Sequence, residues 1–277
     1  MNDINRTLAP VGVFDSGVGG LTVAREIMRQ LPNEKIVYFG DTARLPYGSK
    51  SQDTVLRYSR QIIRFLMTKE VKAIVIACNT ASAYALETVE RELDIPIIGV
   101  IRAGARTAVH STRNGKIGVI GTEGTISSGI YTDVMRQMRP DIEVTVKACP
   151  LFVPLVEEGL LHDTVTDEIA SRYLSVLKGR FIDTLVLGCT HYPLIRSTLG
   201  RIMGDEVTLV NPAYETAIEL KALLEEKDLA CQRAEDDGGN EKYQFYVSDL
   251  AEKFTAFATS ILPNEVKETR KIHVEGY

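Results

Sequence analysis

Three kinds of segment are missing from this sequence of 277 residues. No apolar run approaches the ~18 residues that a membrane-spanning helix needs, and the first ten residues lack the charged-then-apolar pattern of a secretion signal. No block of Lys and Arg stands out, and the net charge is −5. These absences argue against membrane insertion, secretion and nucleic-acid binding, and they predict a cytoplasmic protein.

Cysteine is scarce, with four residues in the chain: Cys78, Cys149, Cys189 and Cys231. In a reducing compartment such residues are expected to be thiols rather than disulfides. Cys78, Cys189 and His191 could converge on a zinc ion, but no C-x-x-C pair and no second histidine at ligand spacing supports such a site. We therefore expect no bound metal.

Short apolar runs alternate with stretches of helical periodicity, which is typical of an α/β fold with mostly parallel strands. Helices are predicted at 21–31, at 82–93, and from Ser127 to just before Pro140, and Ser248 is the predicted N-cap of a helix near the C-terminus. The charged segment 225–242 is interpreted as a surface excursion. The predicted strands are residues 11–15, 35–40, 72–77, 96–100, 116–121, 143–148, 183–188, 207–211, 243–247 and 271–274.

The chain also contains two pairs of similar segments, which suggest an internal repeat. "VGVFDSG", which starts at residue 11, resembles "IGVIGTEG", which starts at residue 117, and "AIVIACNT" resembles "TLVLGCTH". The first pair lies 106 residues apart, and the cysteines of the second pair, at positions 78 and 189, lie 111 residues apart. All α/β strands look somewhat alike, but similar offsets predict two related α/β units, each with a cysteine at the carboxyl end of a strand.

A glycine-rich turn, "DSGVGG", joins the first predicted strand to the first helix. Its glycines allow close approach of the backbone, and the helix that follows offers free N–H groups to an anion. The dinucleotide pattern G-x-G-x-x-G fits at Gly17 and Gly19 but fails at Thr22, and no G-K-[ST] follows. We interpret the turn as a small-molecule site in which Asp15 and Ser16 face the ligand; a plain turn is the alternative.

A second loop with a ligand-site position is "GDTARLPYGSKS", which follows the second predicted strand. Open α/β sheets bind ligands at the carboxyl ends of their strands. A plain loop would account for Pro46 and Gly48 here, but the position favours one wall of a binding site that also includes Tyr47.

Two of the cysteines, Cys78 and Cys189, are predicted at a strand end and at the threshold of a helix, where a helix N-terminus stabilises a thiolate. Cys149 and Cys231 lack this setting and are interpreted as non-catalytic. The residues that follow the first two can donate a hydrogen bond to a carboxylate or titrate: Asn79, Thr80, Thr190 and His191.

Two thiols that face one pocket suit the inversion of a stereocentre. Such a reaction removes a proton from one face of a carbon and returns a proton to the opposite face, so one group is the base while the other is the acid. Thiols can play both parts if their pKa values lie near ambient pH. A hydrolase that uses one cysteine with His191 and a non-catalytic ligand-binding protein remain alternatives.

Four motifs, "VFDSGVGGLTV", "YFGDTARLPYG", "ACNTASA" and "GCTHYP", in this order and spacing closely resemble the glutamate racemases, from about residue 11 to the 250s. The resemblance implies a racemase that needs no cofactor and interconverts L- and D-glutamate, the D-form feeding peptidoglycan synthesis. It also implies two similar α/β domains related by pseudo-symmetry, with the active site in the cleft between them. The first would comprise 1–99 and 211–277, and the second 100–210. We expect a homodimer, whose geometry the sequence leaves open.

The resemblance also carries roles onto matching residues. It implies that Cys78 takes the proton from D-glutamate and Cys189 from L-glutamate, with Asp15, His191 and Glu157 assisting. An aspartate racemase would use the same two cysteines, so the length of the substrate side chain is left open. The implied substrate-binding residues are Asp15, Ser16, Pro46, Tyr47, Gly48, Asn79, Thr80, Thr122, Thr125, Thr190 and His191.

Overall fold

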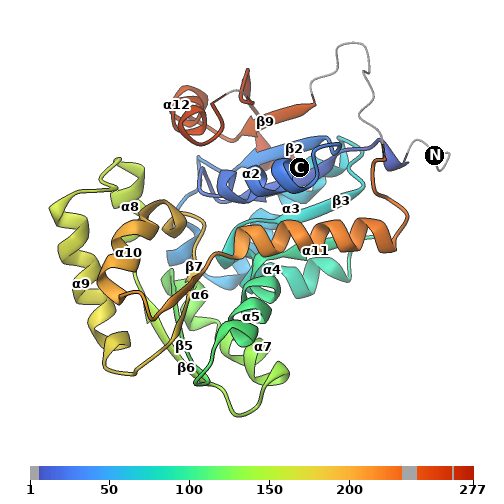
Figure 1. Cartoon of the computed structure of the whole chain (residues 1–277). Helices are drawn as coiled ribbons and strands as arrows, with labels where there is room; N and C mark the ends of the chain where they lie inside the picture. The colour runs from blue at the N-terminus through green and yellow to red at the C-terminus, as the bar shows by residue number, and fades with distance from the viewer. Residues whose placement is uncertain (1–5, 233–241, 264) are drawn as a thin grey trace.

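Two parallel β-sheets with helices packed on their faces make up the computed structural model, which describes residues 6–232, 242–263 and 265–277 (Figure 1). All neighbouring strands in both sheets pair in parallel, which confirms the predicted α/β class. The first sheet contains β1 (Val11–Asp15), β2 (Ile36–Gly40), β3 (Ala73–Ile76), β4 (Ile97–Gly99), β9 (Tyr243–Val247) and β10 (Thr269–Lys271). The second contains β5 (Lys116–Gly121), β6 (Glu143–Ala148), β7 (Thr184–Gly188) and β8 (Thr208–Val210).

The second sheet repeats the strand arrangement of the first. The strand orders are β10-β9-β2-β1-β3-β4 and β6-β5-β7-β8, so β2-β1-β3-β4 corresponds to the whole second sheet. The register is repeated too: Phe14 pairs with Ile76, and Ile120 and Leu187, 106 and 111 residues further on, pair in the same way. The duplication predicted from two sequence offsets therefore extends to strand order and register.

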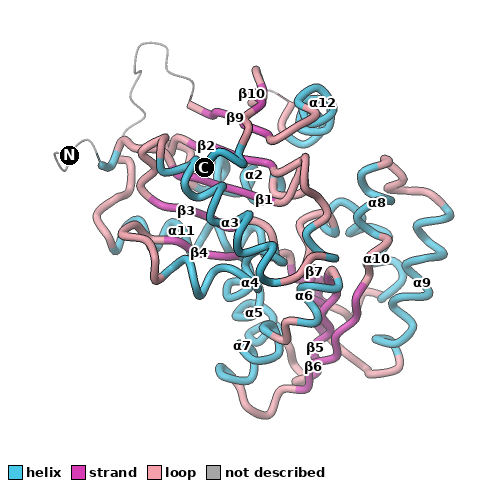
Figure 2. The backbone as a smooth tube through the Cα atoms, turned by 180° about the vertical axis from the view of Figure 1, so that it is seen from behind, coloured by secondary structure: helices cyan, strands magenta, loops and turns pink. Residues whose placement is uncertain are grey.

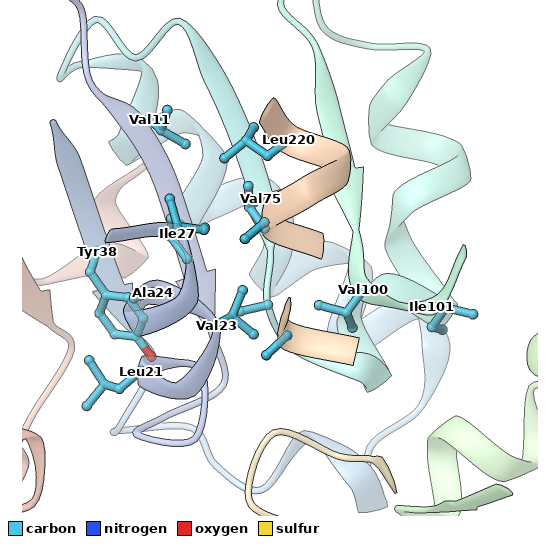
Figure 3. Packing of buried hydrophobic residues seen from close by; sticks show 14 of the residues in the cluster. Val11, Leu21, Val23, Ala24, Ile27, Tyr38, Val75, Val100, Ile101 and Leu220 are labelled. Atoms are coloured by element: carbon cyan, nitrogen blue, oxygen red, sulfur yellow. The ribbon is translucent and has the colours of Figure 1, made fainter. Parts of the chain in front are cut away.

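A shared apolar core lies between the sheets and joins them. It contains Val75 of the first sheet and Val186 of the second, and Figure 3 shows Ile27 and Leu220 packed beside Val75 within it. Because burial of apolar surface drives this packing, the two halves of the molecule share one continuous hydrophobic core between their sheets. The helices of this central layer are α2 (Leu21–Gln30), α5 (Val100–Ser111), α7 (Ile130–Met138) and α11 (Pro212–Glu226).

The remaining helices cover the outer faces of the sheets and their ends (Figure 2). The helices on the first sheet are α3 (Gln52–Met67) and α4 (Asn79–Glu90). Those on the second sheet are α8 (Phe152–Glu157), α9 (Thr164–Lys178) and α10 (Arg196–Met203). The others are α6 (Glu123–Ser127), α12 (Ala251–Ile261) and three 3₁₀ turns, Tyr47–Ser49, Tyr192–Ile195 and Val274–Gly276. Among the described residues, none of the helices has the length and apolar character needed to cross a bilayer.

The helix predicted from Ser127 to Pro140 is wrong in its start. Two helices occupy this stretch, because α6 ends at Ser127 and Gly129 takes a left-handed conformation with φ 72° before α7 begins. A residue with positive φ interrupts helical hydrogen bonding, and glycine adopts it without steric cost.

Two predictions near the C-terminus are also wrong. Ser248 is not the N-cap of α12, since Leu250 holds that place. The Ser248 hydroxyl instead donates to Asp41 Oδ1 at 2.8 Å and accepts from the Ala43 N–H at 2.8 Å. The last strand spans residues 269–271 rather than 271–274. Within the predicted excursion at 225–242, residues 233–241 lie outside the described part of the chain.

Candidate active site

A cavity opens where the carboxyl ends of the two sheets face each other. Its first wall comes from the segments after β1, β2 and β3, and its second from the segments after β5 and β7 together with α8. The predicted site residues that line it are Ser16, Pro46, Tyr47, Gly48, Cys78, Asn79, Thr80, Thr122, Glu157, Cys189, Thr190 and His191. The cysteines of the two repeated units therefore share one cavity.

Two predicted site residues lie behind the cavity wall instead. Asp15 is fully buried, and its carboxylate accepts from the Gly17 N–H at 3.0 Å and from the Thr190 hydroxyl at 3.4 Å. Burial raises the pKa of Asp15 above its ordinary value. The Thr125 hydroxyl lies 3.2 Å from that of Thr80, so both residues support the wall through side chains that do reach the cavity.

The Cys78 sulfur sits at the N-terminus of α4, as the sequence predicted. It accepts from the Ala81 N–H at 3.4 Å, and its S–H donates to the Ser16 hydroxyl at 3.7 Å. Burial and the neighbouring Asp15 raise the pKa of Cys78 to about 12. At neutral pH this sulfur therefore carries its proton.

Cys189 has a different environment. The expected helix directly after it is a 3₁₀ turn, Tyr192–Ile195, so its sulfur lacks the α-helix N-terminus that Cys78 has. Its nearest titratable partner is His191, whose Nδ1 lies 3.8 Å from the sulfur and whose Nε2 lies 3.0 Å from Glu157 Oε1. Burial alone would lower the pKa of His191, but these two partners raise it to about 10. A protonated His191 therefore places a positive charge beside the Cys189 sulfur.

Hydroxyl and amide groups line the seam between the two walls. Thr80 on the first and Thr122 on the second lie 2.8 Å apart through their hydroxyl oxygens. The Asn79 side-chain oxygen, Oδ1, accepts from the Tyr131 hydroxyl at 2.8 Å, again across the seam. The two halves are thus in direct polar contact beside the cavity.

A buried carboxylate organises the loop that carries Pro46, Tyr47 and Gly48. Asp41 is fully buried and accepts from the Tyr47 hydroxyl and from Arg44 Nε, the latter at 2.8 Å. Sequence reasoning did not single out Asp41, although it lies within the quoted "YFGDTARLPYG" motif.

Three residues that sequence reasoning missed also line the cavity: Gly17, Leu45 and Val153. Gly17 and Leu45 lie inside the motifs that indicated the site, so the sequence could have identified them. Val153 lies in an apolar stretch of α8, and nothing in its local pattern separates it from a core residue.

The other two cysteines are not among the residues that line this cavity. Cys149 is buried, and burial raises its pKa to about 12. The backbone N–H of Cys231 donates to Glu34 at 2.8 Å, at the opposite ends of the strands. No group of three His, Cys, Asp or Glu side chains that could hold a metal ion occurs in the described part of the chain.

The fold and the motifs agree with one class of enzyme. The Asp/Glu/hydantoin racemase family model matches residues 11–217. The glutamate racemase of Geobacter metallireducens is 48% identical over 266 residues, which cover 96% of this chain and 97% of that protein.

Solved structures give the same result. Glutamate racemase isoform RacE1 from Bacillus anthracis superposes with a TM-score of 0.91 at 40% identity, covering 95% of this chain and 97% of that one. The glutamate racemase of Francisella tularensis, solved in complex with D-glutamate, gives a TM-score of 0.89 at 39% identity, covering 98% and 100%. The chain belongs to the Asp/Glu/hydantoin racemase family and, within it, to the glutamate racemases. It is an amino-acid racemase, an isomerase.

Proposed function

We propose that this protein interconverts L- and D-glutamate without a cofactor, using Cys78 and Cys189 as two bases on opposite faces of the substrate. The observation that carries the proposal is that the two cysteine sulfurs, one from each repeated sheet, line a single cavity. The complex of the Francisella tularensis relative with D-glutamate supports the choice of substrate.

In the L-to-D direction, the Cys189 thiolate removes the α-proton of L-glutamate. The C–H electron pair passes into the α-carbon and its carboxylate. The Cys78 thiol then delivers its proton to the opposite face, so the product is D-glutamate with a neutral Cys189 and a Cys78 thiolate. The reverse reaction uses the same steps with the roles exchanged. The high pKa of Cys78 and the imidazolium beside Cys189 support this starting distribution of charge.

Three residues are proposed to assist these transfers. His191 would stabilise the Cys189 thiolate, and Glu157 would hold the imidazole through its Nε2 atom. Asp15 interacts electrostatically with Cys78 in the first wall and accepts a hydrogen bond from Thr190 in the second. It would therefore act on one residue of each wall.

The substrate is proposed to bind through local donors rather than through the net charge of −5. Its two carboxylates need hydrogen-bond donors, and those on the cavity wall are backbone N–H groups, amides, hydroxyls and the His191 imidazole. The binding residues proposed from the sequence motifs are Asp15, Ser16, Pro46, Tyr47, Gly48, Asn79, Thr80, Thr122, Thr125, Thr190 and His191. Asp15 and Thr125, which lie behind the cavity wall, would act through Thr190 and Thr80.

At the level of the whole chain, we propose a first domain of residues 1–99 with 211–277 and a second of residues 100–210. The change of sheet between β4 and β5, and again between β8 and β9, supports these limits. We further propose a cytoplasmic homodimer that supplies D-glutamate for peptidoglycan; light scattering of the purified protein would test the dimer.

The test of the activity is proton exchange in D₂O. Purified protein without added cofactor is incubated with L- or D-glutamate, and the α-proton NMR signal and the circular dichroism are followed together. The proposal predicts loss of the α-proton signal and convergence of both enantiomers to a racemate. Turnover of aspartate but not of glutamate, or turnover that depends on added pyridoxal phosphate, would contradict it.

A further inference from the structure

Tyr131 reaches from the second half of the molecule into the first. It lies on α7, is 2% exposed, and donates its hydroxyl hydrogen to Asn79 Oδ1 at 2.8 Å. Asn79 directly follows Cys78 and lines the cavity. No sequence motif pointed to Tyr131, which stands 52 residues after its partner.

The Tyr131 side chain passes beside two glycines. A Cβ atom at Gly188 would lie 3.2 Å from Tyr131 Cε2, and one at Gly104 would lie 3.4 Å from the tyrosine hydroxyl. Gly188 directly precedes Cys189. The ring therefore passes the backbone next to one cysteine and ends on the side chain next to the other.

A primary amide has two unlike ends, and a partner on one end fixes which group the other end presents. The oxygen accepts hydrogen bonds and the NH₂ group donates them. With Oδ1 held by Tyr131, the NH₂ group of Asn79 is left for a ligand in the cavity. A rotated amide would turn its oxygen toward a carboxylate, which also only accepts hydrogen bonds, and the two would repel.

Tyr131 can keep this amide in one orientation over the working pH range. Burial and the negative charge that Cys189 can carry raise the pKa of Tyr131 above its ordinary value. The phenol therefore stays protonated and remains a donor. A phenolate would accept rather than donate, and the preference for Oδ1 would be lost.

We propose that Tyr131 is a positioning residue for substrate binding, whose hydroxyl holds the Asn79 amide so that its NH₂ group faces a substrate carboxylate. This inference rests on the proposed glutamate racemase activity. It assigns to Tyr131 a role in affinity rather than in proton transfer, because its hydroxyl bonds to Asn79 and not to either cysteine.

The test compares Tyr131→Phe with wild type in both directions of racemisation. Loss of one hydrogen bond that orients a ligand-binding group should raise KM about fivefold to tenfold, with kcat within about twofold of wild type. The matched control is Tyr246→Phe, since Tyr246 is also buried and its hydroxyl donates to Gln244 at 2.8 Å, outside the cavity. The control should leave KM unchanged.

A double variant separates positioning from a general loss of structure. In an Asn79→Ala background, Tyr131→Phe should change KM by less than about twofold, because the amide that it orients is gone. The Asn79 side-chain NH₂ signal in a ¹⁵N-labelled protein should shift on glutamate addition in wild type and lose that shift in Tyr131→Phe. All variants are compared at a temperature at which their circular dichroism shows them folded.

The outcomes distinguish this inference from the proposed function. Wild-type KM in Tyr131→Phe, or an equal further rise in KM when the change is added to Asn79→Ala, would overturn the role of Tyr131 alone. Absence of glutamate racemisation by the wild-type protein would overturn the proposed function and this role with it.

Discussion

At the scale of single residues, two cysteines that the sequence repeats have unlike surroundings. Cys78 is at a helix N-terminus beside a buried carboxylate, and its pKa is raised to about 12. Cys189 is beside an imidazole whose pKa is raised to about 10. The Cys78 sulfur is protonated at neutral pH and the Cys189 sulfur lies next to a positive charge, as the proposed two-base reaction requires.

The pH dependence of the reaction should follow these groups. The protonated forms of Cys78 and His191 are favoured in the folded protein, so both are present at neutral pH and are lost as pH rises, His191 first, near pH 10. We predict that kcat/KM with L-glutamate is bell-shaped and falls on the alkaline side. A value that keeps rising to about pH 11 in folded protein would contradict the assignment of charges.

Glu157 should set the position of that alkaline fall. Its carboxylate lies 3.0 Å from His191 Nε2 and raises the pKa of the imidazole. Glu157→Gln should move the alkaline limb of the kcat/KM profile to lower pH by about one unit. Glu158→Gln changes an exposed neighbour and serves as the control. An unchanged limb in Glu157→Gln would show that this carboxylate does not act through His191.

The sequence predicted most residues of the cavity wall but not the partners that hold them. Strand ends and glycine turns are local patterns, and they located Cys78 and Cys189 correctly at one cavity. The contacts of Tyr131 with Asn79 and of Asp41 with Ser248 join segments 52 and 207 residues apart. Such pairs depend on how the sheets pack, which no local pattern encodes.

At the scale of elements, the turn after β1 packs closely against the opposite half of the molecule. A Cβ at Gly19 would lie 2.3 Å from Thr190 Oγ1 and 2.5 Å from His191 Nδ1. Glycine is therefore required here by the close approach of the opposite wall, which explains one of the three glycines in "DSGVGG".

Gly19→Ala should damage activity far more than stability. The added methyl must displace His191 or separate the walls, so we predict a loss in kcat/KM of at least about tenfold, since small misplacements of catalytic groups are costly. Gly200→Ala, in α10, is the control, because its nearest neighbour would lie at 3.6 Å. Wild-type kinetics in Gly19→Ala would mean that the walls tolerate separation during turnover.

Element boundaries show where local reasoning failed. The sequence predicted one helix from Ser127 to just before Pro140, but a single left-handed residue, Gly129, divides the region. Ser248 has the side chain of a helix cap, yet it hydrogen-bonds the buried Asp41 instead. In both cases a contact or a conformation outside the repeating pattern decided the outcome.

At the scale of the whole molecule, the two duplicated units differ in the contacts that hold their loops at the strand ends opposite the cavity. Lys72 precedes β3 and forms a buried ion pair with Glu34 at 2.5 Å. Asp183, 111 residues later, precedes β7 and accepts from the Thr112 hydroxyl at 2.6 Å and the Arg113 N–H at 2.7 Å. The equivalent positions 72 and 183 thus carry opposite charges, and each side chain holds loops of its own unit through polar contacts.

Lys72→Met should lower stability without changing catalysis. It would leave the buried Glu34 carboxylate without its cation, and breaking a buried pair in this way costs roughly 3 kcal/mol or more of unfolding free energy. Lys178→Met, on an exposed residue at the end of α9, is the control. Urea unfolding measures the difference in unfolding free energy between each variant and the wild type. A change in KM at unaltered stability would contradict this structural role of Lys72.

The most direct test of the two-base account uses Cys78→Ala and Cys189→Ala with a glutamate analogue that carries a leaving group on its β-carbon. Each variant should nearly abolish racemisation in both directions, because every turnover takes one proton and gives one. Elimination needs only one base, which removes the α-proton as the leaving group departs. Cys189→Ala, with Cys78 left, should prefer the D-analogue, and Cys78→Ala should prefer the L-analogue. The same enantiomer preferred by both variants, or full racemisation by either, would contradict the account.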